Sequence, residues 1–216
     1  MGKAFGTISF DPAKCKRELR DLGKLLKANS ELSESRNILP FFKARQQLAA
    51  FISTYAPDIG PTPEMAYEYS FLGDFSADLV LGNRKKREYL AIEFEDGKAN
   101  SIFKKVKGRS TTDWSARFEH GFSQLVDWFY TLDDYKKTDK FRKEFGNGHV
   151  TFSGLLIVGR NAGITDSDRI RIEWRTDKVL VDSHSISCIT FDDLHETLEG
   201  RLDNYLAASK FGKKNS

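Results

Sequence analysis

The stretch ADLVLGNRKKREYLAIEFEDGK, residues 77–98, decides the fold. It contains two runs rich in β-forming apolar residues, and a basic turn separates them. Residues 76–82 and 88–95 are therefore predicted strands, with Gly82-Asn83 supplying the turn between them. A third candidate, residues 66–72, precedes them and ends at Gly73-Asp74. Together the three runs predict an antiparallel meander.

Acidic side chains gather on one face of this meander. In residues 88–95, Leu90, Ile92 and Phe94 fall on one face, and Glu93 and Glu95 fall on the other. Pairing with the preceding strand would add Asp78. Three close carboxylates repel each other, and Mg²⁺ or Mn²⁺ is their natural counter-charge. An E-x-E pair is equally typical of a solvated sheet face, and spacing alone favours that simpler interpretation.

The rest of the chain predicts helices around one mixed sheet, hence an α/β (α+β) fold. A short strand is expected within residues 3–10, and Pro40 is expected to start a new helix in a mostly helical region. Predicted helices cover residues 12–28, 31–55, 112–132 (capped by Thr112 or Asp113), 138–145 and 192–206, and predicted strands cover 151–159 and 186–191. Residues 166–176 fit either a strand or a helix. We expect an N-terminal helical region (1–60), a core (61–210) and a basic tail (211–216).

The helix at 112–132 carries a second stripe beside its apolar one, formed by Arg117, Gly121, Gln124 and Trp128. An arginine and a glutamine at this spacing suit a phosphate or a metal-bound water, although an ordinary boundary stripe fits equally. Five basic residues precede the helix: Lys98, Lys104, Lys105, Lys107 and Arg109. They suit a nucleic-acid backbone, and a solvated loop fits as well. For the basic turn at 84–87, an exposed turn tip is favoured.

Composition excludes several classes of protein. The 216 residues carry a net charge of +3, which permits nucleic-acid binding without demanding it. No apolar run could cross a membrane, and the N-terminus does not resemble a signal peptide. Cys15 and Cys188 lack metal or redox spacing, which predicts free buried thiols in the cytoplasm. The four histidines show no metal-ligand spacing, and neither a phosphate loop nor a G-x-S-x-G elbow is present.

The order D-(x14)-E-x-E on two strands, followed by a helix reading HGFSQLVDWF, resembles the Shedu family of prokaryotic antiviral nucleases. That family belongs to the PD-(D/E)XK superfamily. LLIVGR at 155–160 and CITFDDL at 188–194 are similar to later parts of the family pattern, so the resemblance covers about residues 30–206. It implies a restriction-endonuclease-like fold, with residues 166–176 helical.

The resemblance also implies a site and an activity. Asp78, Glu93 and the backbone carbonyl of Phe94 would bind Mg²⁺ or Mn²⁺, while Glu95 and Gln124 would assist catalysis. Lys98, Lys104, Lys105, Lys107, Arg109 and Arg117 would contact the DNA backbone. The activity would be DNA cleavage in anti-phage defence, with a homo-oligomer or a defence-system protein as partner.

The chain departs from the superfamily pattern at Glu95, where a lysine is usual. Glu95 could accept a proton from water, and Lys98 could partly replace the missing positive charge. The alternative functions are therefore a DNA-binding module without catalysis and an assembly subunit.

Overall fold

A seven-stranded mixed sheet forms the centre of the molecule in the computed structural model, which describes residues 4–61, 63–70, 76–146 and 148–212. The strands in spatial order are β1 (Gly6–Thr7), β2 (Glu64–Ser70), β3 (Ser76–Asn83), β4 (Glu88–Phe94), β7 (Thr151–Ile157), β9 (His184–Ile189) and β8 (Leu180–Val181). Strands β1 to β4 are antiparallel, which confirms the predicted meander. Strands β4, β7 and β9 are parallel, and β8 is antiparallel to β9.

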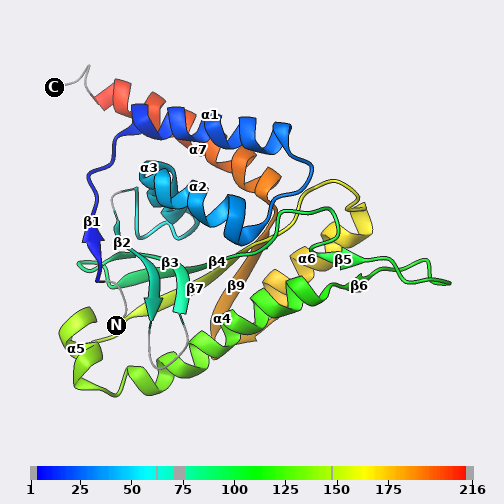
Figure 1. Cartoon of the computed structure of the whole chain (residues 1–216). Helices are drawn as coiled ribbons and strands as arrows, with labels where there is room; N and C mark the ends of the chain where they lie inside the picture. Colours follow the sequence, from blue (N-terminus) through cyan, green and yellow to red (C-terminus); the bar gives the residue numbers. More distant parts are fainter. Residues whose placement is uncertain (1–3, 62, 71–75, 147, 213–216) are drawn as a thin grey trace.

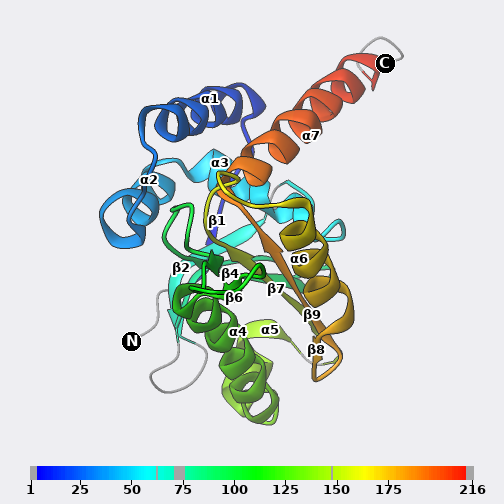
Figure 2. The same cartoon turned by 90° about the vertical axis from the view of Figure 1, so that its right-hand side faces the viewer.

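Helices cover both faces of this sheet (Figures 1 and 2). One face packs against α1 (Pro12–Ala28), α2 (Leu39–Ala44), α3 (Gln46–Phe51) and α7 (Phe191–Gly212). The other packs against α4 (Ala116–Tyr135), α5 (Asp139–Phe145) and α6 (Asp166–Lys178). Two short helical turns, η1 (Glu34–Ile38) and η2 (Ile52–Tyr55), flank α2 and α3, and a small hairpin joins β5 (Phe103–Lys104) to β6 (Asp113–Trp114).

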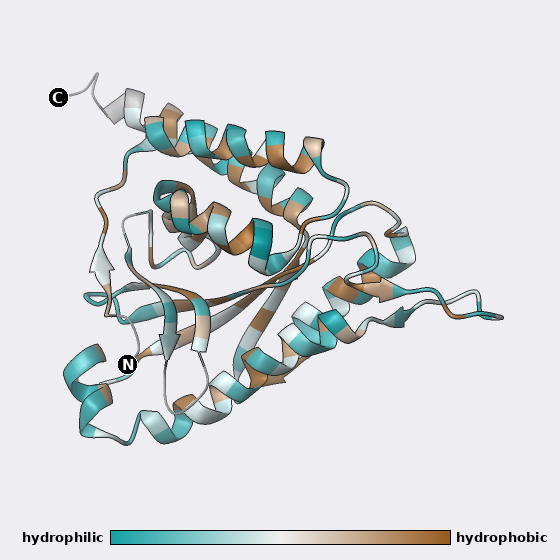
Figure 3. Ribbon diagram, in the orientation of Figure 1, coloured by the Kyte–Doolittle hydropathy of each residue, from teal (hydrophilic) through white to brown (hydrophobic). Residues whose placement is uncertain are grey.

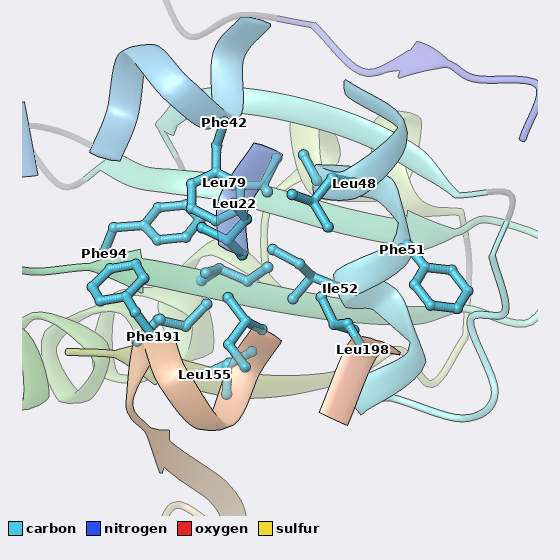
Figure 4. Packing of buried hydrophobic residues seen from close by; sticks show 14 of the residues in the cluster. Leu22, Phe42, Leu48, Phe51, Ile52, Leu79, Phe94, Leu155, Phe191 and Leu198 are labelled. Carbon is cyan, nitrogen blue, oxygen red and sulfur yellow. The ribbon is translucent and has the colours of Figure 1, made fainter. Parts of the chain in front are cut away.

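The alternation of side chains along β3 and β4 divides the core in two. Leu79, Ile92 and Phe94 belong to the cluster under α2, α3 and α7, and Figure 4 shows Leu79 and Phe94 there with Phe42, Leu48 and Phe191. Val80 and Ala91 point to the opposite face, beneath α4. Both faces of β4 are therefore buried, so the interpretation of Glu93 and Glu95 as part of a solvated sheet face is wrong.

Most predicted elements are present, and the differences have local causes. The helix expected from residue 112 begins at Ala116, because Asp113 and Trp114 pair with β5 and leave Ser115 as the N-cap. The proposed caps Thr112 and Asp113 are therefore wrong. Residues 166–176 form a helix, which starts at a capping box between Thr165 and Asp168.

Smaller differences lie at the element ends. Leu32 bridges to Gly97, so the helical region begins at Glu34 instead of residue 31. Strand β7 ends at Ile157 and Gly159 adopts a positive φ of 75°, so the predicted strand 151–159 was too long. The predicted strand end at residues 71–72 and the tail residues 213–216 lie outside the described residues.

The remaining expectations concern the cysteines and the membrane. Cys15 and Cys188 are free and buried, as predicted, and burial raises the pKa of each thiol to about 12. Among the described helices, none has the length and apolar character needed to span a bilayer.

Candidate metal centre

The candidate site lies where β3 and β4 part from each other. The strands pair up to Leu79 and Ile92, and the same register places Asp78 opposite Glu93. There the carboxylates replace the backbone ladder: Asp78 Oδ2 accepts the Phe94 N–H at 2.9 Å, and Glu93 accepts the backbone N–H of Asp78. Beyond this point β4 continues beside β7. We call this position, with Asp78 and Glu93, the fork.

The two fork carboxylates lie in a setting that disfavours negative charge. Burial raises the pKa of Glu93 to about 10, and the charges of Asp78 and Glu95 add to the effect. Burial likewise raises the pKa of Asp78 to about 7, although the hydrogen bond from Phe94 opposes the shift. Glu93 is only 4% exposed, and its Oε2 lacks a hydrogen-bond partner among the described residues. A buried, unpaired carboxylate oxygen calls for a proton or a cation.

Glu95 is fully buried, and two basic side chains from α4 hold it. Its Oε2 accepts a hydrogen bond from Arg117 at 3.0 Å, and its Oε1 lies 2.7 Å from His120 Nδ1. Arg117, not Lys98, is thus the positive charge that contacts Glu95. Lys98 instead pairs with Asp96 at 2.8 Å.

Arg117 links Glu95 to a wider acidic group. It lies 3.5 Å from Glu34 and 3.7 Å from Asp96. Asp96 accepts the Glu34 N–H at 2.9 Å. Burial and the charge of Glu95 raise the pKa of Glu34. For Asp96, hydrogen bonds from Lys98 and Glu34 outweigh burial and lower its pKa.

The backbone around the site explains how these groups meet. Reciprocal hydrogen bonds of 3.0 and 2.8 Å between Leu32 and Gly97 hold Glu34 close to the end of β4. On the other side, α4 crosses β4 at Gly121. A Cβ there would lie 2.7 Å from Leu156 Cδ1 and 2.8 Å from Glu95 Cγ, so glycine permits this approach without displacing either side chain. One turn further along, Gln124 Oε1 is buried without a partner among the described residues.

The oxygen ligands at the fork fit a hard divalent cation, but few of them come from side chains. Within the described ranges, no group of three or more His, Cys, Asp or Glu side chains is arranged to hold a metal ion. The side chains of Asp78 and Glu93 would thus supply two ligands, and main-chain oxygen and water the rest. Mg²⁺ is commonly bound by one or two carboxylates with several waters. The unpaired oxygen of Glu93 is the observation that favours such a cation.

The predicted DNA-contacting residues divide into two groups. Lys98 and Arg117 lie within the acidic site. Lys104, Lys105, Lys107 and Arg109 are exposed on the hairpin between β5 and β6, which extends away from the body of the molecule in Figure 1. Arg109 lies 3.6 Å from Asp113 across that hairpin. The hairpin follows residues 98–102 in the chain, and no hydrogen bond or ion pair joins its basic residues to the site among the described residues.

Three residues of the site were missed from the sequence: Glu34, Asp96 and His120. The histidines show no metal-ligand spacing, yet His120 lies three residues after Arg117 and four before Gln124, on the same helix face. That spacing could have identified it. Asp96 directly follows the E-x-E pair, which was also a usable signal. Glu34 comes from a distant turn, and its local sequence carries no such sign.

The mixed sheet flanked by helices, with a buried acidic fork, is consistent with a nuclease-like α/β fold. Comparison with protein-family models matches residues 31–195 to the family described as Shedu protein SduA, C-terminal. The match covers most of the chain, including the fork and α4, so the chain belongs to the Shedu family. Membership implies a role in defence against phage. Comparison with curated proteins gives no match.

Proposed function

We propose that this protein is a metal-dependent endonuclease that hydrolyses DNA phosphodiester bonds in the cytoplasm during anti-phage defence. The observation that carries the proposal is the buried Glu93 carboxylate, with an unpaired oxygen beside Asp78 at the fork. Both charges are costly in this place without a cation. Family membership and the nuclease-like fold support the same assignment.

Asp78, Glu93 and the Phe94 carbonyl would hold Mg²⁺ or Mn²⁺. A bound ion of this kind lowers the pKa of water and offsets charge on a phosphate in the transition state. The hydrogen bond from Phe94 N–H to Asp78 fixes the carboxylate relative to β4. The chain itself thereby provides a rigid pair of ligands, because both come from sheet positions with little freedom to move.

Glu95 and His120 would transfer the proton from the attacking water, and Arg117 would supply positive charge near the phosphate. Glu95 is the acceptor for a proton from the attacking water. Arg117 contacts Glu95 at 3.0 Å and supplies the positive charge for which the superfamily uses a lysine. The side chain of His120 is 62% exposed and lies 2.7 Å from Glu95, so it can pass that proton to solvent.

Gln124 and the basic residues would position the DNA. The buried Oε1 of Gln124 has no donor among the described residues, so a bound water or a substrate group would supply its hydrogen bond. Lys104, Lys105, Lys107 and Arg109 would contact the phosphate backbone of DNA that extends beyond the site, and Lys98 would do so from beside Asp96.

Cleavage of plasmid and linear DNA with Mg²⁺ or Mn²⁺ tests this proposal. Asp78→Asn and Glu93→Gln should reduce cleavage by more than the roughly 10–100-fold typical for residues that only support a metal ligand. Asp127→Asn is the matched control, because Asp127 is exposed on α4. Metal-independent cleavage, or full activity in both fork variants, would refute the assignment.

A DNA-binding or assembly module without catalysis is the second candidate. It is favoured by the engagement of both Glu95 oxygens with Arg117 and His120, because a carboxylate paired with an arginine is a weaker acceptor for a proton from water. Its partner would be a second copy of the chain or a defence protein. Exposed Ile170, Trp174 and Leu180 on α6 and β8 offer an apolar surface for such a contact. DNA binding without cleavage in either metal would favour this candidate.

A further inference from the structure

A basic groove lies between α1 and the junction of α2 and α3. Its volume is about 640 Å³. Five basic side chains line it: Lys14, Arg17, Arg20, Lys24 and Arg45. Helix α1 precedes the segment that matches the family model, so this groove is built largely from residues outside that match. Figure 3 shows hydrophilic residues along the outer side of α1.

The acidic residues of the groove do not neutralise it. Glu18 is buried, and its carboxylate accepts the Leu48 N–H at 2.8 Å. Asp21 lies 3.4 Å from Arg45 and 3.5 Å from Lys24. Five basic and two acidic side chains leave a surplus of three positive charges in the groove. Clustered charge of one sign attracts an anionic ligand.

Three of these cations are available to a ligand. Lys14, Arg17 and Arg20 are exposed, and within the parts of the chain that the structure describes they form no salt bridge. The basic residues from Lys14 to Lys24 lie on one side of α1, because they follow each other at three- and four-residue steps. At about 1.5 Å per residue, the row is roughly 15 Å long. One DNA strand places a phosphate about every 3.4 Å along the axis, so the row would span roughly four phosphates.

The chemistry of the groove favours a phosphate backbone over a nucleotide. None of the described lining residues is aromatic, so the groove lacks a surface on which a base could stack.

We propose that this groove binds the phosphodiester backbone of duplex DNA as a second contact, away from the point of cleavage. The choice of DNA as the polyanion rests on the proposed function. Phosphate contacts of this kind fix position and register without reading sequence. These contacts would hold the DNA in place, because the fork alone would contact only a few of its nucleotides.

The test is duplex DNA binding without divalent metal, measured by fluorescence anisotropy over a range of salt concentrations. The variant Lys14→Gln/Arg17→Gln/Arg20→Gln should weaken binding and lower the steepness of log K against log salt by about 2–3. The control Lys86→Gln/Lys140→Gln/Lys143→Gln removes the same charge at exposed sites elsewhere and should change that steepness far less. Thermal unfolding checks that both variants remain folded, and the single variant Arg17→Gln provides a milder change.

Affinity and salt dependence equal to wild type in the groove variant would overturn the inference, as would a wild-type protein that binds no DNA. The metal-dependent cleavage assay at saturating DNA reports on the proposed function separately. Loss of binding in the groove variant, with no cleavage by wild type, would leave the inference standing and refute the nuclease. Cleavage by wild type, together with unchanged DNA binding in the groove variant, would support the nuclease and refute the inference.

Discussion

Glu93 shows how one residue joins folding to function. A glutamate that is 4% exposed, with neighbouring carboxylates, holds its proton to a pKa of about 10 unless a cation replaces that proton. The same burial that makes the charge costly also makes the side chain a strong ligand, since water does not compete for it. Burial of Glu93 therefore favours binding of a cation and lowers the free energy of unfolding of the metal-free protein at neutral pH.

We expect Glu93→Gln to stabilise the metal-free protein at pH 8. Above pH 4.5 the unfolded chain loses the Glu93 proton, whereas the folded chain keeps it to about pH 10, so unfolding releases protons and wild-type stability falls as pH rises. Glutamine has no titratable proton, so Glu93→Gln removes this loss of stability with rising pH. In a chelator, the melting temperature of the variant should exceed that of wild type by about 2–4 °C for each kcal/mol gained, and the gap should close near pH 4.5.

Metal supplies the control for that experiment. Added Mg²⁺ should raise the melting temperature of wild type but not of Glu93→Gln, because only the native wild-type site binds it. An identical response of both proteins to pH and to Mg²⁺ would contradict the assigned role of Glu93.

The pair of Glu95 and Arg117 provides a second prediction. Arg117→Met leaves a fully buried carboxylate with His120 as its remaining partner and should lower the free energy of unfolding by about 1–3 kcal/mol. The value lies below that of a fully buried pair because the Arg117 side chain is 44% exposed. Urea unfolding of Arg117→Met, Glu95→Gln and the double variant measures the coupling. Strictly additive effects would show that the two side chains do not stabilise each other.

At the scale of elements, the crossing of α4 over β4 sets the site. Gly121→Ala adds a methyl group 2.7 Å from Leu156 Cδ1 and 2.8 Å from Glu95 Cγ, so these two side chains or the helix must shift. Although alanine favours helix by about 1 kcal/mol, overpacking of about 1–3 kcal/mol should outweigh the gain. Gly200→Ala on α7 is the matched control, since nothing lies within 4 Å of its Cβ, and it should stabilise the protein. Thermal unfolding that ranks the two variants in the opposite order would contradict this packing.

The elements also show what sequence can predict. The meander was predictable because period-two patterns in β3 and β4 are local and strong. The start of α4 was not, since the β5–β6 pairing depends on Phe103 packing against Trp114, a contact that no local pattern encodes. Asp78, Glu93 and Glu95 could be proposed from strand alternation. Glu34 could not, because contacts between distant segments place it near the site: the Leu32–Gly97 pairing and the hydrogen bond from its N–H to Asp96.

At the scale of the whole molecule, Arg160 fastens the N-terminal helix to the sheet. Its guanidinium donates to the carbonyls of Leu26 and Asn29 at 2.9 and 2.7 Å, at the end of α1. It also holds Asp192, at the start of α7, through Nε and Nη2 at 3.0 Å. One side chain after β7 therefore connects the two outer helices, and through α1 it supports the basic groove.

Replacement of Arg160 by methionine should loosen α1 as well as lower stability. The side chain is 13% exposed, and its loss leaves two carbonyls at the end of α1 without this donor and the Asp192 carboxylate with only the Asn161 N–H, so we expect a cost of about 3 kcal/mol or more. Arg169→Met removes an ion pair of 3.6 Å to Asp193 with 41% exposure and should cost at most about 1 kcal/mol. Hydrogen exchange distinguishes local from global effects, because amides of α1 should lose protection in Arg160→Met more than those of β4. Equal loss in both elements would mean that α1 has no separate opening and that Arg160 stabilises the fold only as a whole.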